Sequence, residues 1–460
     1  MNSVWQRFTL SDLPLYQWRA SSYLYRLVGP LQAWRQSSWL MQSGDLIGAL
    51  LISLIFGLAP FVSNDLVGVL LFAGAAYWVL LTVSDDAKTG STPIHLLVLL
   101  YWSVATVATS LSPVKKAAFT GWTKLTLYLL LFALMARVLR SPRLREWLIT
   151  VYLHVALLVS VYGLRQWFFG ATALATWVDP TSNMAGTTRV YSYLGNPNLL
   201  AAYLLPAVAL SLAAIFAWRS WATRALALTM FVVNSLCLVL TFSRGGWIGL
   251  VFVVLAFLVL SIFWWSVRLP SFWRKWLLPV LLGSLALVTV LAVGFVEPLR
   301  DRVFSMFAGR EDSSNNFRLN VWTAVIDMIR DRPLIGIGPG NNAFNKVYPL
   351  YQVSPKYTAL SAYSIPLEIA VESGLIGLSC FVWLIVVTCT QGLRQVGRLR
   401  TYASREGFWL MGAIAAILGL LAQGFFDTVW YRPEVNTLWW LMVALVASYY
   451  IRPQTDAEKG

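Results

Sequence analysis

Arg244 is the residue in this sequence whose surroundings best suit the binding of an anion. It stands in a short polar break, Ser243 to Gly246, between two long apolar runs. A guanidinium group presents several N–H donors in a planar fork that matches phosphate and carboxylate oxygens. The two glycines remove side chains beside it and let a backbone or ligand come close. We expect Arg244 to face a phosphate, a diphosphate or another oxyanion; the alternative is an arginine that extends to the lipid headgroups.

Arg318 is the second candidate for anion binding. It opens the amphipathic segment FRLNVWTAVIDMIRDR, four residues before Trp322, so both side chains point the same way from a helix. We expect Asn315 or Asn316 to cap this helix and Pro333 to end it. A cation in a first helical turn is unfavourable with the helix dipole. A bound anion or a nearby carboxylate must therefore compensate for Arg318.

Polar residues at two other positions on the same side add to the candidate site. In YLGNPNLLAAYLLP, Asn196 is typical of a helix N-cap and Pro197 of a first helical residue. A cap needs only one such side chain, so capping does not explain the second asparagine, Asn198. Asp427, in QGFFDTVWYRPE, is expected to pair with Arg432.

Two carboxylates stand just inside an apolar run in SAYSIPLEIAVESGLIG. Glu368 and Glu372 are four residues apart and so share one helix face. Carboxylates inside a membrane span are costly unless they are paired. We expect Arg318 or Arg244 to be the partner, either as a structural salt bridge or within a binding site.

The elements that must position these residues are membrane helices. Hydrophobic residues make up 58% of the 460-residue chain and charged residues only 12%, against roughly a quarter in soluble proteins. A water-soluble core cannot enclose so much apolar surface, so we predict an all-α polytopic membrane protein. About twelve stretches are long enough to cross a bilayer: 45–63, 66–83, 92–112, 117–137, 147–168, 199–217, 225–242, 245–265, 276–296, 366–391, 408–426 and 434–451.

Basic residues set the predicted orientation. With the N-terminus inside, every short inner loop is basic, as the positive-inside rule expects; one such loop holds Arg137, Arg140, Arg143 and Arg145. We predict a multi-pass protein of the inner (plasma) membrane with both termini in the cytoplasm. The net charge of +15 then reflects topology and contact with anionic membrane lipids, not nucleic-acid binding.

The predicted chain has five parts. They are a cytoplasmic segment at 1–44, nine transmembrane helices within 45–296, a large periplasmic loop at 297–365, three transmembrane helices within 366–451 and a cytoplasmic tail at 452–460. The large loop combines the amphipathic helix with a turn-rich segment, LIGIGPGNNAF, so we expect it to be partly helical.

The large loop is unusually basic for an outer loop. One interpretation is that its cations pair with the acids of the same loop, Glu297, Asp301, Glu311, Asp312, Asp327 and Asp331. The other is that the loop holds an anionic ligand at the outer membrane face. The cations are Arg300, Arg302, Arg310, Arg318, Arg330, Arg332, Lys346 and Lys356.

The three cysteines offer no metal site. Cys237, Cys380 and Cys389 all fall within predicted spans, where a cysteine is typically a small apolar packing residue. Their spacing matches neither a metal-ligand set nor an outer disulfide pair. We expect neither a metal nor another cofactor.

Four segments together carry a family resemblance. SYLGNPNLLAAYL, TFSRGGWIGL, FRLNVWTAVIDMIRDRPLIGIGPGN and IPLEIAVESGLIG, in this order and with a long outer loop between late spans, resemble the O-antigen ligase and polymerase superfamily of polytopic membrane proteins. The last segment, the basic N-terminal region and the length resemble its cyanobacterial branch, the IctB family, to which bicarbonate transport is attributed. The resemblance covers about residues 40 to 450.

The resemblance implies roles for particular residues. Arg244 matches the arginine of the ligases' S-R-G segment, and Arg318 matches the arginine four residues before a tryptophan. Both are implied to hold the diphosphate of an undecaprenyl-linked glycan, which the ligases transfer to an acceptor hydroxyl without a metal or a nucleotide. The site is then expected to be lined by Arg244, Arg318, Trp322, Tyr363, Glu368, Glu372, Asn196 and Asn198.

The resemblance also implies a histidine in the large loop, just before the helix that carries the glutamate, as a base or an orienting group. In this sequence that position is Tyr363. The only two histidines are His95, near the inner end of the third span, and His154, within the fifth. With an ordinary pKa of about 10, a tyrosine is poorly suited to take a proton at neutral pH. The anion-binding half of the implied site is present and the proton-handling half is missing.

Three functions remain open. The first is transport or accumulation of bicarbonate, a small oxyanion that Arg244 and Arg318 would suit; the absence of a broken helix pair and of a coupling-ion site deep in the bilayer speaks against it. The second is transfer or binding of a lipid-diphosphate-linked glycan. The third is a non-catalytic subunit of a larger membrane complex. We assign inorganic-carbon transport first and glycan transfer as its alternative.

Overall fold

The chain folds into helices joined by mostly short loops. The computed structural model describes residues 2–10, 34–35, 37–84, 91–171, 188–295, 297–305, 307 and 309–451, and this part contains no strand. Most of the predicted N-terminal segment 1–44 and all of the tail 452–460 lie outside the described residues. The α-helices are α1 (Asn2–Phe8), α5 (Trp39–Gln42), α6 (Gly44–Leu58), α7 (Asn64–Val83), α8 (Pro93–Ser110), α9 (Lys115–Val138), α10 (Pro142–Phe169), α11 (Pro197–Ala217), α12 (Trp221–Leu240), α13 (Arg244–Trp265), α14 (Ser271–Phe295), α15 (Glu297–Ser305), α16 (Ser313–Asp331), α17 (Asn341–Val347), α18 (Ile365–Thr401), α19 (Glu406–Gly424) and α20 (Pro433–Ser448).

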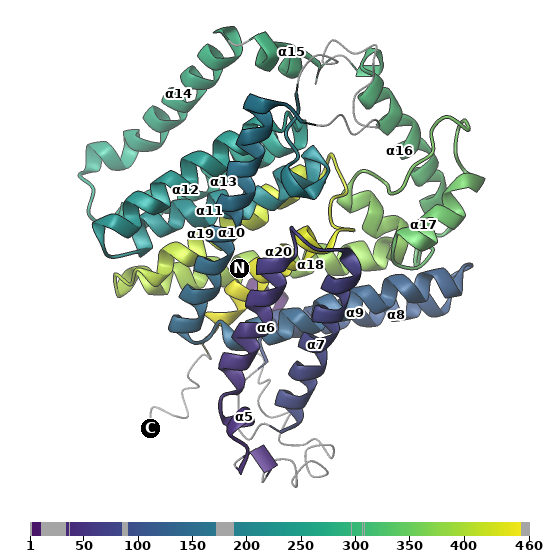
Figure 1. Cartoon of the computed structure of the whole chain (residues 1–460), viewed down its shortest axis with the longest axis horizontal. Coiled ribbons are helices and arrows are strands. Elements are labelled where there is room, and N and C mark those ends of the chain that lie inside the picture. Colours follow the sequence, from purple (N-terminus) through teal and green to yellow (C-terminus); the bar gives the residue numbers. More distant parts are fainter. Residues whose placement is uncertain are drawn as a thin grey trace.

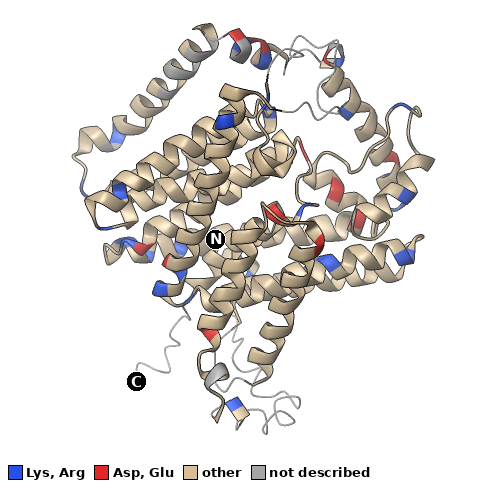
Figure 2. Ribbon diagram, in the orientation of Figure 1, with Lys and Arg blue, Asp and Glu red and all other residues tan. Residues whose placement is uncertain are grey.

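Each of the twelve predicted apolar stretches contains one long helix, and the all-α polytopic membrane fold is confirmed. Among the described residues, nine helices are long and apolar enough to cross a membrane. They are α7, α8, α9, α10, α11, α12, α13, α18 and α19. The other three are α6, with 15 residues, α20, with 16 residues, and α14, in which several side chains are not described. Figure 2 shows charged residues mostly near helix ends, with long uncharged stretches between them.

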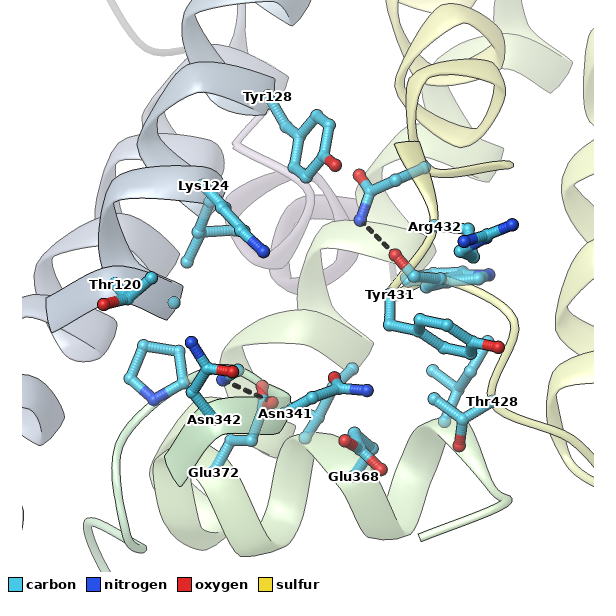
Figure 3. A pocket seen from close by; sticks show the side chains of 18 of the residues that line it. Thr120, Lys124, Tyr128, Asn341, Asn342, Glu368, Glu372, Thr428, Tyr431 and Arg432 are labelled. Carbon is cyan, nitrogen blue, oxygen red and sulfur yellow. Dashed lines mark hydrogen bonds between the residues drawn. The ribbon is translucent and has the colours of Figure 1, made fainter. Parts of the chain in front are cut away.

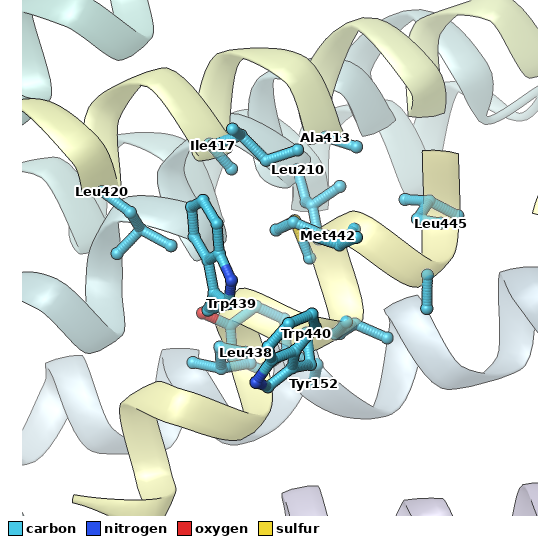
Figure 4. Close-up of a cluster of buried hydrophobic side chains, with 14 of the residues drawn as sticks. Tyr152, Leu210, Ala413, Ile417, Leu420, Leu438, Trp439, Trp440, Met442 and Leu445 are labelled. Carbon is cyan, nitrogen blue, oxygen red and sulfur yellow. The ribbon is translucent and has the colours of Figure 1, made fainter. Parts of the chain in front are cut away.

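The core of the bundle lies around α11, α19 and α20. Both α11 and α19 are buried along most of their length, and α19 packs against α11, α13 and α20. Trp439 of α20 is 1% exposed and lies among aliphatic side chains of the neighbouring helices (Figure 4). Within a bilayer, the close packing of such side chains holds the helices together.

Small residues let α13 approach its neighbours closely. A Cβ added at Gly246 would lie 2.6 Å from the Cβ of Ala201 in α11, and one at Gly249 would lie 2.8 Å from the backbone oxygen of Gly419 in α19. Gly245 faces Gln423 of α19, 3.3 Å from the position of an added Cβ. Of the two alternatives expected at Gly245 and Gly246, a close backbone or a close ligand, the structure shows neighbouring helices packed closely against both glycines.

The helix α18 is broken near its start. Gly374 has φ +69° and ψ −174°, so the residues from Ile365 to Ser373 form a short helix of their own before the long membrane helix begins. The break is filled by backbone from the large loop: Leu375 N donates to Pro333 O at 2.7 Å, and Ile337 N donates to Val371 O at 2.9 Å. The single span predicted at 366–391 therefore begins with a separate short helix.

The turn-rich segment of the loop is fixed against two helices. Gly338 N donates to Glu372 O of α18 at 2.8 Å, and the hydroxyl of Ser112 donates to Ile337 O. A Cβ on Gly121 of α9 would lie 1.9 Å from Pro339 O, so helix and loop touch through bare backbone. The loop helices α16 and α17 accordingly lie beside the ends of α8, α9 and α18 (Figure 1).

Candidate anion-binding site

The turn between α12 and α13 is the platform of the site. Only Thr241, Phe242 and Ser243 separate the two helices, and Phe242 adopts φ +50°. The hydroxyl of Ser243 accepts from Gly246 N at 3.2 Å and so caps α13. The carbonyl groups at the end of α12 carry the negative end of its dipole and attract cations. Two arginines use them: Arg189 Nε donates to Thr241 O, and Arg302 Nε donates to Phe242 O, each at 3.0 Å.

Arg244 follows this turn directly and is 7% exposed. Its guanidinium donates to Asp312 Oδ1 at 2.9 Å and to Ser305 O at 3.0 Å. Asp312 also accepts from Asn315 N at 2.8 Å and is the N-cap of α16, so the prediction that Asn315 or Asn316 caps this helix is wrong. The arginine thus faces a carboxylate from the large loop, in the position where an anion was expected.

Arg318 lies 3.8 Å from Asp427 Oδ2, measured from its Nη2 atom. Because α16 begins at Ser313, Arg318 is in the second helical turn, and the expected conflict with the helix dipole does not arise. Asp427 does not pair with Arg432, which lies 3.9 Å from Glu434 instead. The compensating group for Arg318 in this structure is the carboxylate of Asp427.

Trp322 lies on the Arg318 face of α16, as the four-residue spacing predicts. Its Nε1 donates to Ala362 O at 3.0 Å and so ties α16 to the chain just before α18. Asn196 caps α11 as predicted, accepting from Asn198 N at 2.8 Å. Asn198 Oδ1 accepts in turn from Arg189 Nη2 at 3.3 Å, which explains the asparagine that a cap alone did not require.

The four arginines lie close enough to affect one another. Burial lowers the pKa of Arg302, and Arg189, Arg244 and Arg318 lower it further, while Asp312 acts in the opposite direction. Burial likewise lowers the pKa of Arg189, again with contributions from Arg244 and Arg318. Four arginines against the carboxylates of Asp312 and Asp427 leave a formal excess of two positive charges.

Burial raises the pKa of Asp427, and Arg318 and Arg189 partly offset this effect. Within the cluster, neighbouring guanidinium groups repel one another, and the two aspartates offset only part of this repulsion. An anion placed among the arginines would reduce the remaining repulsion and could accept hydrogen bonds from their N–H groups.

Glu368 and Glu372 do not pair with the arginines as expected. Glu368 Oε2 accepts from Ala362 N, and Glu372 Oε1 accepts from Gly340 N at 2.6 Å. Both carboxylates line a separate cavity between α9 and α18 (Figure 3). Their cost of burial is met by backbone donors of the large loop, not by salt bridges.

Tyr363 lies beside the cluster but is a poor proton acceptor. Burial raises its pKa to about 12, with Asp427 adding to the effect. Its ring meets Phe317 edge-on at 5.5 Å, and its φ of +50° is uncommon for a bulky residue. Neither histidine is near: His95 binds Thr92 in the first turn of α8, and His154 contacts Thr150 O within α10.

Local pairing explains only some of the basic residues in the loop. Arg300 lies 3.4 Å from Glu297, and Arg330 lies 3.0 Å from Asp327. Arg302 and Arg318 instead reach the cluster. The side chain of Glu311 lies outside the described residues.

Sequence reasoning missed two members of the cluster. Arg189 was not singled out, and Arg302 was one of eight similar loop cations. The only sequence signal for Arg189 is an arginine outside the membrane close to Asn196 and Asn198. For Arg302 there is none, since its contact with Phe242 joins residues 60 positions apart.

Residues 225–382 match the family model described as O-antigen ligase. The matched segment contains Arg244, Arg302, Arg318, Glu368 and Glu372, but ends before Asp427 and begins after Arg189. It supports a relation to the O-antigen ligase and polymerase superfamily and does not distinguish the IctB branch. No curated protein matched the chain.

Proposed function

We propose that the arginine cluster binds the diphosphate of a lipid-linked glycan at the outer membrane face, and that the protein transfers the glycan from this carrier to an acceptor hydroxyl. The observation that carries the proposal is the cluster of four arginines: Arg189 and Arg302 bind the turn between α12 and α13, Arg244 follows this turn, and Arg318 lies near enough to lower the pKa of Arg302. The ligase-family match over the central part of the chain supports it independently.

Charge favours a diphosphate over a smaller anion. A diphosphate esterified at both ends carries two negative charges, which equals the formal excess of the cluster. Bicarbonate carries one. In glycan transfer the bond from the sugar to the diphosphate breaks, and negative charge grows on the leaving diphosphate. Arginines held in place by backbone carbonyls are suited to stabilise that charge without rearrangement.

The acceptor hydroxyl must lose its proton as the new bond to the sugar forms. No imidazole can take it, since both histidines lie elsewhere, and burial raises the pKa of Tyr363 to about 12. Carboxylates are the remaining candidates, and Asp312, Asp427, Glu368 and Glu372 all lie around the turn-rich loop or the cluster. We infer that a carboxylate replaces the histidine of the ligase pattern.

Bicarbonate transport is kept as a second candidate because of one observation. The break of α18 at Gly374 places unwound backbone beside the buried Glu368 and the half-buried Glu372, and discontinuous helices of this kind often hold the substrate in secondary transporters. A carrier would need the site to open to the inner face as well.

The test of the proposed function is binding of a polyprenyl-diphosphate-linked sugar to the purified full-length protein in lipid nanodiscs. Arg244→Ala and Arg318→Ala should each weaken binding about tenfold or more, because each removes a charge-assisted hydrogen bond. Arg330→Ala is the matched control, since Arg330 is on the same helix as Arg318 but is 75% exposed and pairs only with Asp327.

Equal binding by the wild type and both cluster variants would overturn the proposal. The same preparations in proteoliposomes test the second candidate. Uptake of labelled bicarbonate that is lost in Arg244→Ala would establish a carrier; no uptake under any ion gradient by folded protein would exclude it.

A further inference from the structure

A second polar site lies beside the arginine cluster. A cavity of about 380 Å3 lies between α9, α18, the loop at Pro339–Asn342 and the segment from Thr428 to Asn436. Its volume is within the roughly 300–1,000 Å3 typical of small-molecule pockets. Figure 3 shows Glu368 and Glu372 on one wall and Lys124 and Tyr128 on the opposite wall. The proposed function uses at most the carboxylates of Glu368 and Glu372 from this lining and assigns no ligand to the space itself.

Several buried polar atoms of the lining have no hydrogen-bond partner among the described residues. They include Trp430 Nε1 and Asn436 Oδ1, whereas Thr428 and Glu368 lie close enough to interact with each other. Glu368 is 6% exposed and Thr428 is 4% exposed. A buried polar atom without a partner costs free energy, so a group of them around one cavity indicates a ligand that supplies both donors and acceptors.

The lining has no excess of positive charge and so does not favour an anion. Two glutamates, Glu368 and Glu372, stand against two cations, Lys124 and Arg432, and Arg432 also lies 3.9 Å from Glu434. Within the described residues no group of three histidines, cysteines or acids is close enough to hold a metal ion. The cavity thus differs from the cluster, where positive charge is in excess.

Aromatic rings complete the lining. Tyr101, Tyr128, Trp430, Tyr431 and Trp440 all border the cavity. Aromatic faces pack well against the C–H faces of a sugar ring, while the polar tips of Tyr and Trp bind its hydroxyl groups. Hydroxyl groups both donate and accept, which suits the carboxylate, amide, hydroxyl and indole groups present.

The cavity and the cluster share a wall. Asp427 contacts Arg318, and the next residue, Thr428, lines the cavity. Ala362 accepts from Trp322 on the cluster side and donates to Glu368 on the cavity side. The cluster and the cavity are therefore adjacent.

We propose that this cavity binds a sugar unit of the glycan, with Glu368 accepting a hydrogen bond from a sugar hydroxyl and Trp430 and Asn436 binding further hydroxyl groups. The inference rests on the proposed function for the identity of the glycan. The sugar belongs either to the lipid-linked donor or to the acceptor.

The experiment separates the sugar from the diphosphate. Binding to the purified full-length protein in nanodiscs is measured for three probes: polyprenyl diphosphate, polyprenyl-diphosphate-linked N-acetylglucosamine, and free chitobiose. We expect the sugar to strengthen binding of the lipid, or the free disaccharide to bind measurably, and Glu368→Gln to reduce that sugar-dependent effect about tenfold. Arg244→Ala should instead weaken both lipid probes alike.

The probes distinguish the two sources of the sugar. An effect seen only with the lipid-linked sugar places the donor in the cavity, and one seen only with the disaccharide places the acceptor there. Asp327→Asn is the control for replacing a carboxylate by an amide, because Asp327 lies half-exposed on α16 and pairs locally with Arg330. Tyr128→Phe, on the opposite wall, provides a second variant should Glu368→Gln fold poorly.

The proposal is overturned if neither sugar probe shows a sugar-dependent effect, or if the effect is the same in Glu368→Gln, Tyr128→Phe and the wild type. Stabilisation by Na+ or Ca2+ that is lost in Glu368→Gln, without any sugar effect, would also overturn it and make the cavity a cation site. Polyprenyl diphosphate that binds normally while the sugar effect is absent would refute this inference and leave the proposed function intact.

Discussion

Two of the arginines in the cluster have an aspartate as their acidic partner. Arg244 binds Asp312 and Arg318 lies near Asp427, and both aspartates come from parts of the chain distant from their partners. Removing one partner of a buried ion pair leaves an uncompensated charge, which is costly. An arriving diphosphate can take over the role of these aspartates. The aspartates then set how strongly the cluster attracts its ligand.

The pH dependence of ligand binding should depend on Asp427. Because burial raises its pKa, Asp427 gains a proton at a pH above the ordinary value of about 4. As the pH falls through this raised pKa, a negative charge beside Arg318 disappears and the cluster becomes more positive. Binding of a diphosphate diester, whose own charge is constant in this range, should strengthen from pH 7 towards pH 4.

Asp427→Asn checks this prediction. The variant should bind the diphosphate ligand several-fold more tightly than the wild type at pH 7, and its affinity should be nearly independent of pH between about 4 and 7. Titration calorimetry in nanodiscs measures both quantities. A pH dependence that persists unchanged in Asp427→Asn would assign the titrating group elsewhere.

At the scale of elements, the break in α18 decides where the loop sits. Three glycines with positive φ, Gly336, Gly338 and Gly340, let the loop run between α9 and α18. Gly374 provides the matching break in the helix. The loop in turn gives Glu372 its hydrogen bond from Gly340 N, so the position of the cavity wall depends on these four residues.

Gly374→Ala should displace the loop. An added Cβ would lie 2.1 Å from Leu334 O, and φ +69° is strained for any residue with a Cβ. Together these effects should cost roughly 2–4 kcal/mol of stability. Thermal unfolding of the protein in detergent should show an apparent Tm several degrees lower than that of the wild type.

Gly397→Ala provides the control in the same helix. Nothing lies within 4 Å of a Cβ added at Gly397, so the substitution should leave the Tm unchanged or raise it slightly. Equal melting of Gly374→Ala and the wild type would show that the loop is not held at this break.

At the scale of the whole molecule, the arrangement in the membrane follows from where charge and apolar surface lie. The short loops on the predicted inner side are basic, and the loop helices α16 and α17 form a folded body on the other side (Figure 1). Arginines in short cytoplasmic loops oppose translocation, which fixes the orientation during insertion. In the predicted orientation, the cluster and the cavity both face the outside.

Cysteine labelling tests this orientation. Lys346 is exposed on α17 and Thr401 is exposed at the end of α18, before α19. In spheroplasts, Lys346→Cys should react with a membrane-impermeant maleimide, whereas Thr401→Cys should react only after the membrane is permeabilised. The native Cys237 and Cys380 are buried and Cys389 is partly exposed within α18, so labelling of the unsubstituted protein gives the background. The reverse pattern would invert the predicted topology.

The sequence alone determined the helices and singled out two arginines of the cluster, Arg244 and Arg318. Hydrophobic runs long enough for a bilayer, interrupted by caps such as Asn196 and Ser243, encode their helices locally, because each helix meets its own backbone hydrogen bonds. Arg244 stood out because it lies in a short polar break beside two glycines, and Arg318 because it opens an amphipathic segment four residues before Trp322. These signals are readable within a few residues of chain.

Only the tertiary structure decided which charges meet. Asp427 joins Arg318 and not Arg432, and Arg302 joins the turn at Phe242 across 60 residues. Glu368 and Glu372 turn away from the arginines into a cavity of their own. The physical reason is that salt bridges and cavities depend on the distances between side chains of different helices. Those distances are set by close approaches such as Gly121 to Pro339, which leave no mark on the local sequence.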